Sequence, residues 1–271
     1  MMILTLIVSS NITSNPSINE VNAADAVVTS EIRVTITNDK APNIMNKVIS
    51  IIKNNKNFLI FITVLFIFRG AIADWHPVPT GSMKPTILEG DVIWENKLAY
   101  DLQVPFTDIS LARLSEPKRG EIIVFTSKAA NKRMIKRLIG LPGEIIEIKK
   151  NQLFINGDPA NYSQLRDPLL APLRENDQEE GVYALESLGS LSHIMQVKPH
   201  YYNPMQNYGP ITIPENQYFV MGDNRDNSAD SRYYGLIPRS EIRGHATRIL
   251  LSLNTKSSYK PRMERFFEML H

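Results

Sequence analysis

Short apolar segments, separated by turn residues, recur along the chain. Clear cases are residues 121–125, 134–141 and 144–148, with Pro142-Gly143 between the last two. Strands of this length joined by proline- and glycine-containing turns are typical of antiparallel sheets. The sequence therefore predicts a mainly β protein whose main domain is built on antiparallel sheet.

The only long apolar run covers residues 58–68 and continues after Arg69 to Ala73. Sixteen residues of helix rise about 24 Å, less than the roughly 30 Å hydrocarbon core of a bilayer. Arg69 could extend its charge to the interface, and a bilayer can thin around a short helix. A buried core helix is the alternative. We predict one N-terminal transmembrane helix here, because the flanking sequences differ so strongly from the run.

Three lysines, Lys47, Lys53 and Lys56, precede the apolar run with no acidic residue between them. Basic residues mark the cytoplasmic end of a transmembrane helix. The chain after Asp74 is therefore expected outside the cytoplasm and next to membrane lipid, with Trp75 at the interface.

Ser82 lies soon after this run, in residues 79–86 (PTGSMKPT). A serine hydroxyl is a poor nucleophile at neutral pH unless a base takes its proton and donors receive the oxyanion. A turn serine is the simpler interpretation of this segment on its own, so the question is whether the chain also supplies a base.

Lys136 is the candidate base, because a strand over residues 134–141 places it on one face with Met134 and Leu138. Burial between apolar neighbours lowers a lysine pKa by up to roughly 3–5 units. A drop of about 3 units leaves a substantial neutral fraction near pH 7.5, at a cost of about 4 kcal/mol. For this segment alone, an amphipathic strand whose lysine reaches solvent is the simpler interpretation.

A third segment, residues 222–235 (GDNRDNSADSRYYG), follows the strand predicted at residues 218–221. Its turn formers and charges would also suit a solvated loop. Together with the segments around Ser82 and Lys136 and with residues 119–125 (RGEIIVF), it resembles the type I signal peptidases. These are membrane-bound Ser/Lys proteases that remove signal peptides from exported proteins.

The resemblance extends from about residue 58 to residue 252 and implies a role for each matched residue. It makes Ser82 the nucleophile and Lys136 the general base. Thr80 stands where the family has a hydroxyl that helps the Ser82 backbone N–H to bind the oxyanion. The implied activity is a membrane-anchored serine endopeptidase that cleaves signal peptides from exported preproteins, without a cofactor.

The resemblance also assigns three residues around this pair. Ser228 matches a serine that orients the lysine, and Asp230 and Arg232 match a pair that braces the site. The implied location is the bacterial cytoplasmic (inner) membrane, crossed once, with the catalytic domain on the periplasmic side. Glu144 stands where many relatives have Asp, which puts only the local turn geometry in doubt.

The composition excludes several other classes of protein. With 30 basic and 28 acidic residues the net charge is +2, which gives no argument for nucleic acid as a partner. The chain has no cysteine, so disulfides and thiolate chemistry are absent. We predict no metal site, because the histidines lack helical ligand spacing; they are His76, His193, His200, His245 and His271.

The expected domain organisation follows from these segments. It comprises a poorly defined N-terminal segment (1–46), a basic flank and transmembrane anchor (47–73), a catalytic β domain (74–158 and 211–253), an inserted β-rich cap (159–210) and a C-terminal tail (254–271). We expect the first eight residues to be a disordered or degenerate leader, the charge cluster at residues 174–180 to be a solvated loop, and the tail to form a short surface helix.

Other chemistries are less well matched. A Ser-His-Asp hydrolase would carry a Gly-x-Ser-x-Gly elbow, which is absent. Ser-x-x-Lys occurs at residues 50–53 and 257–260, beside the anchor and in the tail. Self-cleaving SOS repressors share the Ser/Lys chemistry but are soluble. A catalytically silent, membrane-tethered β domain that binds exported chains is the alternative from another class.

Overall fold

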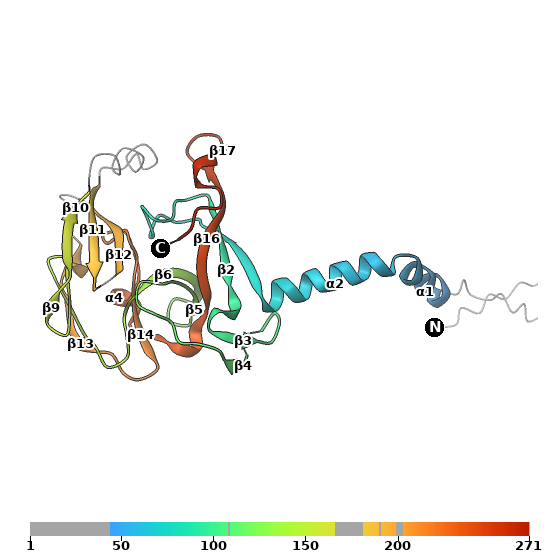
Figure 1. The fold of residues 1–271 in the computed structure, drawn as a ribbon, viewed down its shortest axis with the longest axis horizontal. Coiled ribbons are helices and arrows are strands. Elements are labelled where there is room, and N and C mark those ends of the chain that lie inside the picture. Colours follow the sequence, from blue (N-terminus) through green and yellow to red (C-terminus); the bar gives the residue numbers. More distant parts are fainter. Residues whose placement is uncertain (1–43, 108, 166–180, 190, 199–202, 271) are drawn as a thin grey trace, which may run out of the picture. The chain divides into compact units, whose positions relative to one another are not determined.

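The predicted antiparallel β architecture is present in the computed structural model of the chain (Figure 1). The structure describes residues 44–107, 109–165, 181–189, 191–198 and 203–270. Within these residues the strands form sheets of eight, four, three and two strands. All pairings between these strands are antiparallel.

The largest sheet contains two of the four segments that resemble the peptidase family, those at residues 119–125 and 134–141. In spatial order its strands are β1 (Ala73–Pro77), β2 (Asp91–Asn96), β16 (Ile242–Asn254), β5 (Ile122–Ser127), β6 (Lys132–Gly140), β14 (Gln217–Met221) and β15 (Ile237–Pro238), with β17 (Lys260–Pro261) paired to β16.

The remaining strands, which lie between those of the large sheet along the chain, form three smaller sheets. They are β13 (Tyr208–Thr212), β7 (Ile145–Lys149), β8 (Gln152–Ile155) and β9 (Asp158–Pro159); then β10 (Asn161–Gln164), β11 (Val182–Leu188) and β12 (Leu191–Val197); then β3 (Asp101–Gln103) and β4 (Ser110–Arg113). The short helix α4 (Ser231–Tyr234) and 3-10 turns at Lys97–Ala99, Pro204–Gln206, Arg239–Glu241 and Met263–Arg265 complete the described elements.

The central strand β5 explains how the core positions the site. Successive side chains of a strand point to opposite faces, and the apolar residues of β5 enter two separate clusters. On one face Ile122 and Val124 pack in a cluster with Met83, the residue after Ser82. The cluster on the other face includes Ile123, Phe125, Met134 and Leu138. The segments that carry Ser82 and Lys136 are therefore each fixed by well-packed core.

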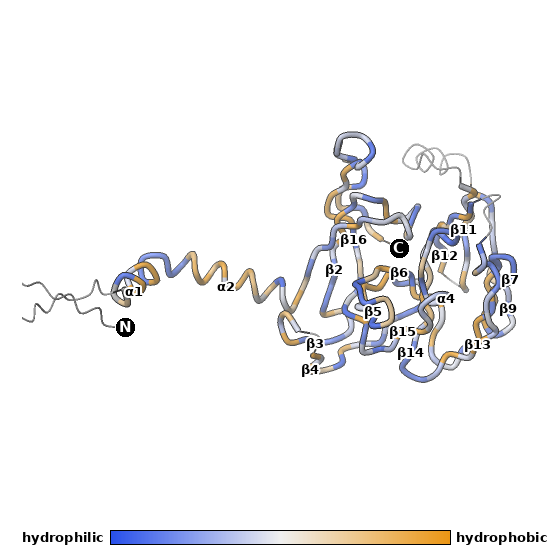
Figure 2. Tube along the Cα trace, turned by 180° about the vertical axis from the view of Figure 1, so that it is seen from behind, coloured by the Kyte–Doolittle hydropathy of each residue, from blue (hydrophilic) through white to orange (hydrophobic). Residues whose placement is uncertain are grey.

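Two helices, α1 (Ile44–Asn54) and α2 (Lys56–Ala71), precede the sheets. Figure 2 shows α2 as predominantly apolar. Its phenylalanines Phe58, Phe61 and Phe66 are each more than half exposed, so α2 is not the buried core helix that was the alternative to an anchor. No single described helix is long and apolar enough to cross a membrane; one bent pair, Lys47–Asn54 with Lys56–Ala71, meets that criterion jointly, by length and composition only.

The C-terminal tail differs from the predicted surface helix. After β16 the chain returns as β17, makes a single 3-10 turn, and buries Leu270 in the core cluster that contains Met83. The physical reason is the fully buried carboxylate of Asp91, which needs cationic partners. Arg265 supplies one at 2.7 Å, and Arg262 lies 3.7 Å away.

Residues Ile52–His271 cluster as one compact unit. The sheet of β10, β11 and β12 falls within the predicted insertion at residues 159–210, whose boundaries stay a prediction. The predicted leader, most of the 1–46 segment and the charge cluster at 174–180 lie outside the described residues.

Candidate active site

Ser82 and Lys136 meet at the centre of the candidate site. The Lys136 Nζ lies 2.6 Å from the Ser82 Oγ and donates a second hydrogen bond to the backbone carbonyl of Ile135 at 2.9 Å. Lys136 comes from β6 with Met134 and Leu138 buried on either side, as strand alternation predicts. Its side chain is buried, so the amine does not reach bulk solvent.

Burial changes the proton affinity of this amine. Desolvation lowers the pKa of Lys136 to about 8, although the negative charges of Asp230 and Asp223 act in the opposite direction. A group with this pKa is about half neutral near pH 8. The neutral amine can accept a proton from the serine hydroxyl along the 2.6 Å contact, which is the geometry that an activated serine nucleophile requires.

A groove of about 610 Å³ gives access to this pair. One wall is the stretch from His76 to Met83, and the other is formed by residues 132–136 and 226–229. Thr80 is exposed on the groove, two residues before Ser82. An extended peptide could lie in such a groove with a carbonyl next to the serine hydroxyl.

The turn that carries Ser82 is held by the loop at residues 222–225. The backbone N–H of Asn224 donates to the Ser82 carbonyl at 3.1 Å, and its side-chain amide donates to the Gly81 carbonyl at 3.0 Å. Gly222 lies against the same turn, because a Cβ there would stand 2.3 Å from both the Ser82 carbonyl oxygen and the Ser228 hydroxyl. A side chain at position 222 would therefore displace the turn that carries Ser82.

Ser228, Asp230 and Arg232 form a buried group beside Ser82 and Lys136. The Ser228 hydroxyl lines the groove and donates to Asp230 at 2.7 Å. Arg232 binds both oxygens of Asp230 at 2.9 Å, and the Gly222 N–H donates to the same carboxylate at 3.0 Å. Burial raises the pKa of Asp230, but the guanidinium of Arg232 and these hydrogen bonds outweigh it and hold the pKa below its usual value. The structure thus brings all six predicted site residues to one region.

Sequence reasoning missed a second buried ion pair, between Arg137 and Asp223. Arg137 donates from Nε and Nη2 to the two carboxylate oxygens, each at 2.8 Å, and Thr86 donates to the same carboxylate at 2.5 Å. Both residues stand in segments that the resemblance already covers, next to Lys136 and next to Asn224. The adjacency of Arg137 to Lys136 was the available signal, but no sequence pattern links two positions that are 86 residues apart.

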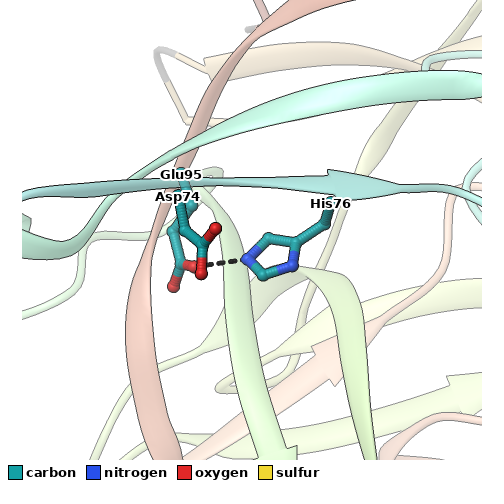
Figure 3. A group of neighbouring side chains, drawn as sticks. All are labelled: Asp74, His76 and Glu95. Atoms are coloured by element: carbon teal, nitrogen blue, oxygen red, sulfur yellow. Dashed lines mark hydrogen bonds and ion pairs between the residues drawn. The ribbon is translucent and has the colours of Figure 1, made fainter. Parts of the chain in front are cut away.

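A group outside the predicted site has ligand atoms suited to a metal ion. Figure 3 shows Asp74 and His76 of β1 beside Glu95 of β2, with His76 Nε2 2.6 Å from a Glu95 oxygen. One ligand atom from each lies within 4.8 Å of the others. Asp74, however, already has Arg69 at 3.0 Å and Lys97 at 3.3 Å. These two cations balance the carboxylate, so we interpret the group as an ion-pair cluster.

The family model and the similar sequences point to the same family. The family model for "Signal peptidase, peptidase S26" matches residues 51–251. Signal peptidase I of Buchnera aphidicola subsp. Schizaphis graminum is 32% identical over 80% of this chain and 82% of its own length. Signal peptidase I of Aquifex aeolicus is 35% identical over 70% of this chain and 79% of its own length. A crystal structure of a signal peptidase I from Enterococcus faecalis V583 is 33% identical, covers 49% of this chain and 99% of that one, and has a TM-score of 0.31. Because the family model matches most of its length, the chain belongs to the signal peptidase family, peptidase S26, and is a peptidase.

Proposed function

We propose that the protein is a membrane-anchored serine endopeptidase that removes signal peptides from exported preproteins by a Ser82/Lys136 dyad. The observation that carries the proposal is the 2.6 Å contact between the Ser82 hydroxyl and a buried lysine amine. A surface lysine would be charged at neutral pH and useless as a base. This one is desolvated by the core that surrounds it.

The mechanism follows from that geometry. Neutral Lys136 takes the hydroxyl proton while the Ser82 oxygen attacks the scissile carbonyl, and the resulting ammonium then protonates the leaving amine. Water, deprotonated by the same amine, hydrolyses the acyl-enzyme. In this proposal Asp230 and Arg232 brace the site, and Ser228, whose hydroxyl is fixed by its hydrogen bond to Asp230, helps to orient Lys136.

The oxyanion of the tetrahedral intermediate needs hydrogen-bond donors directed at its oxygen. We assign these to the Ser82 backbone N–H and the Thr80 hydroxyl. The position of Thr80 on the groove, two residues before the nucleophile, supports this assignment. No cofactor or metal ion enters the proposed reaction.

Thr80→Val tests the oxyanion role, because valine keeps the shape and removes the donor. We expect kcat to fall by about 10²-fold, in the range for loss of one such donor. KM should change little, because the oxyanion is absent from the bound substrate and forms only as the serine attacks. Steady-state kinetics on a preprotein would measure both values, and an unchanged kcat would remove Thr80 from the mechanism.

The anchor is assigned to the helical segment before Ala73. Its exposed phenylalanines would be costly in water, and the lysines before it favour a cytoplasmic N-terminal flank. We therefore place the protein in the bacterial inner membrane, crossed once, with the β domain on the periplasmic side. Protease added to sealed, inverted inner-membrane vesicles should spare that domain; digestion of it in intact vesicles would refute the orientation.

The alternative is a silent domain that only binds exported chains. The purified full chain in detergent, incubated with a preprotein, separates the two functions. We expect one cut at the end of the signal peptide, located by mass spectrometry, and no cut with Ser82→Ala. Ser163→Ala, an exposed serine on β10, is the matched control and should cleave normally. Binding without cleavage by the wild-type protein would favour the silent domain.

The pH dependence of the reaction tests the base. Lys136 must be neutral to act, so kcat/KM should rise with pH through a single ionisation near the Lys136 pKa of about 8 and then level off. A histidine base would place the acidic limb about 1.5 units lower, and a carboxylate base about 4 units lower. A pH–rate profile on purified protein at constant ionic strength makes the measurement.

A further inference from the structure

The inserted sheet is joined directly to the loop that supports Ser82. The N–H of Gln196, on β12, donates to the Asp223 carbonyl at 2.8 Å, and the N–H of Arg225 donates to the Gln196 carbonyl at 2.9 Å. On the other side of this loop, Asn224 donates to the Ser82 carbonyl. The loop at residues 222–225 therefore lies between the inserted sheet and the nucleophile.

A buried charge reinforces this connection. Glu186, on the central strand β11 of the inserted sheet, accepts hydrogen bonds from both Nη atoms of Arg225, with Nη1 at 2.9 Å. The hydroxyl of Tyr162 donates to the same carboxylate at 2.6 Å. Burial raises the pKa of Glu186, but the Arg225 charge outweighs it and keeps the group ionised. Both Glu186 and Arg225 are buried, so water cannot replace the partner of either charge if the other is removed.

A second residue of the inserted sheet continues the network towards the base. His193, on β12, lies 3.3 Å from Glu186 and 3.8 Å from Asp223. Asp223 in turn binds Arg137, the neighbour of Lys136 on β6. Buried polar groups therefore extend from the insertion to the strand that carries the candidate base.

We propose that Glu186 is a positioning residue, an inference that rests on the proposed function. It holds Arg225, and with it the 222–225 loop, against the turn that carries Ser82. Neither Glu186 nor Arg225 lines the groove. Glu186 thus affects the direction and distance of the serine hydroxyl and leaves the substrate contacts in place. A misplaced nucleophile lowers the rate of the bound complex more than it lowers binding.

Glu186→Gln keeps the shape and removes the charge. On the full-length protein we expect kcat to fall by about 10- to 100-fold with KM near the wild-type value. Glu147→Gln, a half-buried glutamate paired with Lys149 on β7, is the matched control and should leave both values unchanged. Glu186→Asp keeps the charge on a shorter stem, so it should recover part of kcat. If Glu186→Gln fails to fold, a folded Glu186→Asp with wild-type kcat would overturn the proposal.

A double-mutant cycle distinguishes positioning from general damage. If Glu186 acts through Arg225, Glu186→Gln combined with Arg225→Gln should lower kcat no more than Arg225→Gln does alone. Additive effects, or a wild-type kcat in Glu186→Gln, would overturn the inference. The proposed function is judged separately: it fails if the wild-type protein does not cleave preprotein or if Ser82→Ala does.

Discussion

Replacing Lys136 with methionine should lower kcat by about 10²- to 10⁴-fold, the usual contribution of a positioned base. Methionine has nearly the length of lysine and fits a site flanked by Met134 and Leu138, so the fold should survive. Without the amine no group within hydrogen-bond distance of the Ser82 oxygen remains to take its proton among the described residues. The measurement is kcat on a preprotein, with circular dichroism to verify folding.

The control for this variant is Lys149→Met, which removes an exposed cation from β7 and should leave kcat unchanged. Lys136→Arg adds a stricter comparison, because a guanidinium keeps the positive charge but cannot act as a base at neutral pH. Retention of near wild-type kcat in either Lys136 variant would mean that another group activates the serine.

Arg137→Met should cost about 3–5 kcal/mol of unfolding free energy at pH 7, the usual range when one partner of a buried ion pair is removed. The Asp223 carboxylate, 1% exposed, would lose two hydrogen bonds at 2.8 Å and keep only that from Thr86. Urea unfolding in detergent, followed by tryptophan fluorescence, measures the loss. Arg113→Met, an exposed arginine 3.6 Å from Glu116, should cost less than about 1 kcal/mol.

The pH dependence of the Arg137→Met effect identifies its cause. In the wild-type protein burial raises the pKa of Asp223, but Arg137 outweighs burial and holds it below 3.8. That stabilisation is complete above pH 3.8 and is lost as the pH falls through the lower folded value. Without Arg137 the effect of burial dominates and raises the pKa of Asp223 in the folded protein. Protonation of Asp223 at acid pH then removes the cost of burying its negative charge. The difference between variant and wild type should therefore shrink between pH 7 and pH 4; a constant difference would point to lost packing.

Strand periodicity was sufficient to predict the environment of Lys136, because the burial of Met134 and Leu138 follows from a period of two. It did not show which sheet a strand joins. β13 and β14 are neighbours in the chain, yet a turn with Asn216 at a positive φ of 60° separates them and they pair in two different sheets. Local pattern predicts that a residue pairs in a sheet, and tertiary packing decides with which partner.

Beyond the pair of Asp230 and Arg232, the supporting contacts of the site could not be predicted from the sequence. Arg137 and Asp223 are 86 positions apart, and neither segment contains a signal that requires the other. The tail is a similar case. Its basic residues suggested a surface helix, whereas Arg265 is held by the buried carboxylate of Asp91, 174 positions earlier. Charges that look solvated in sequence become internal when a distant partner of opposite sign is buried.

The bond between Asn224 and the Gly81 carbonyl spans 143 positions of the chain, which has a bearing on biosynthesis. The ribosome finishes residues 79–86 long before it reaches the residues that steady them. Until that later stretch has been translated and has docked, the turn that carries Ser82 lacks its partner. A newly made copy of this protease should therefore become proteolytically active only near the end of its own synthesis, after most of the polypeptide has already left the ribosome.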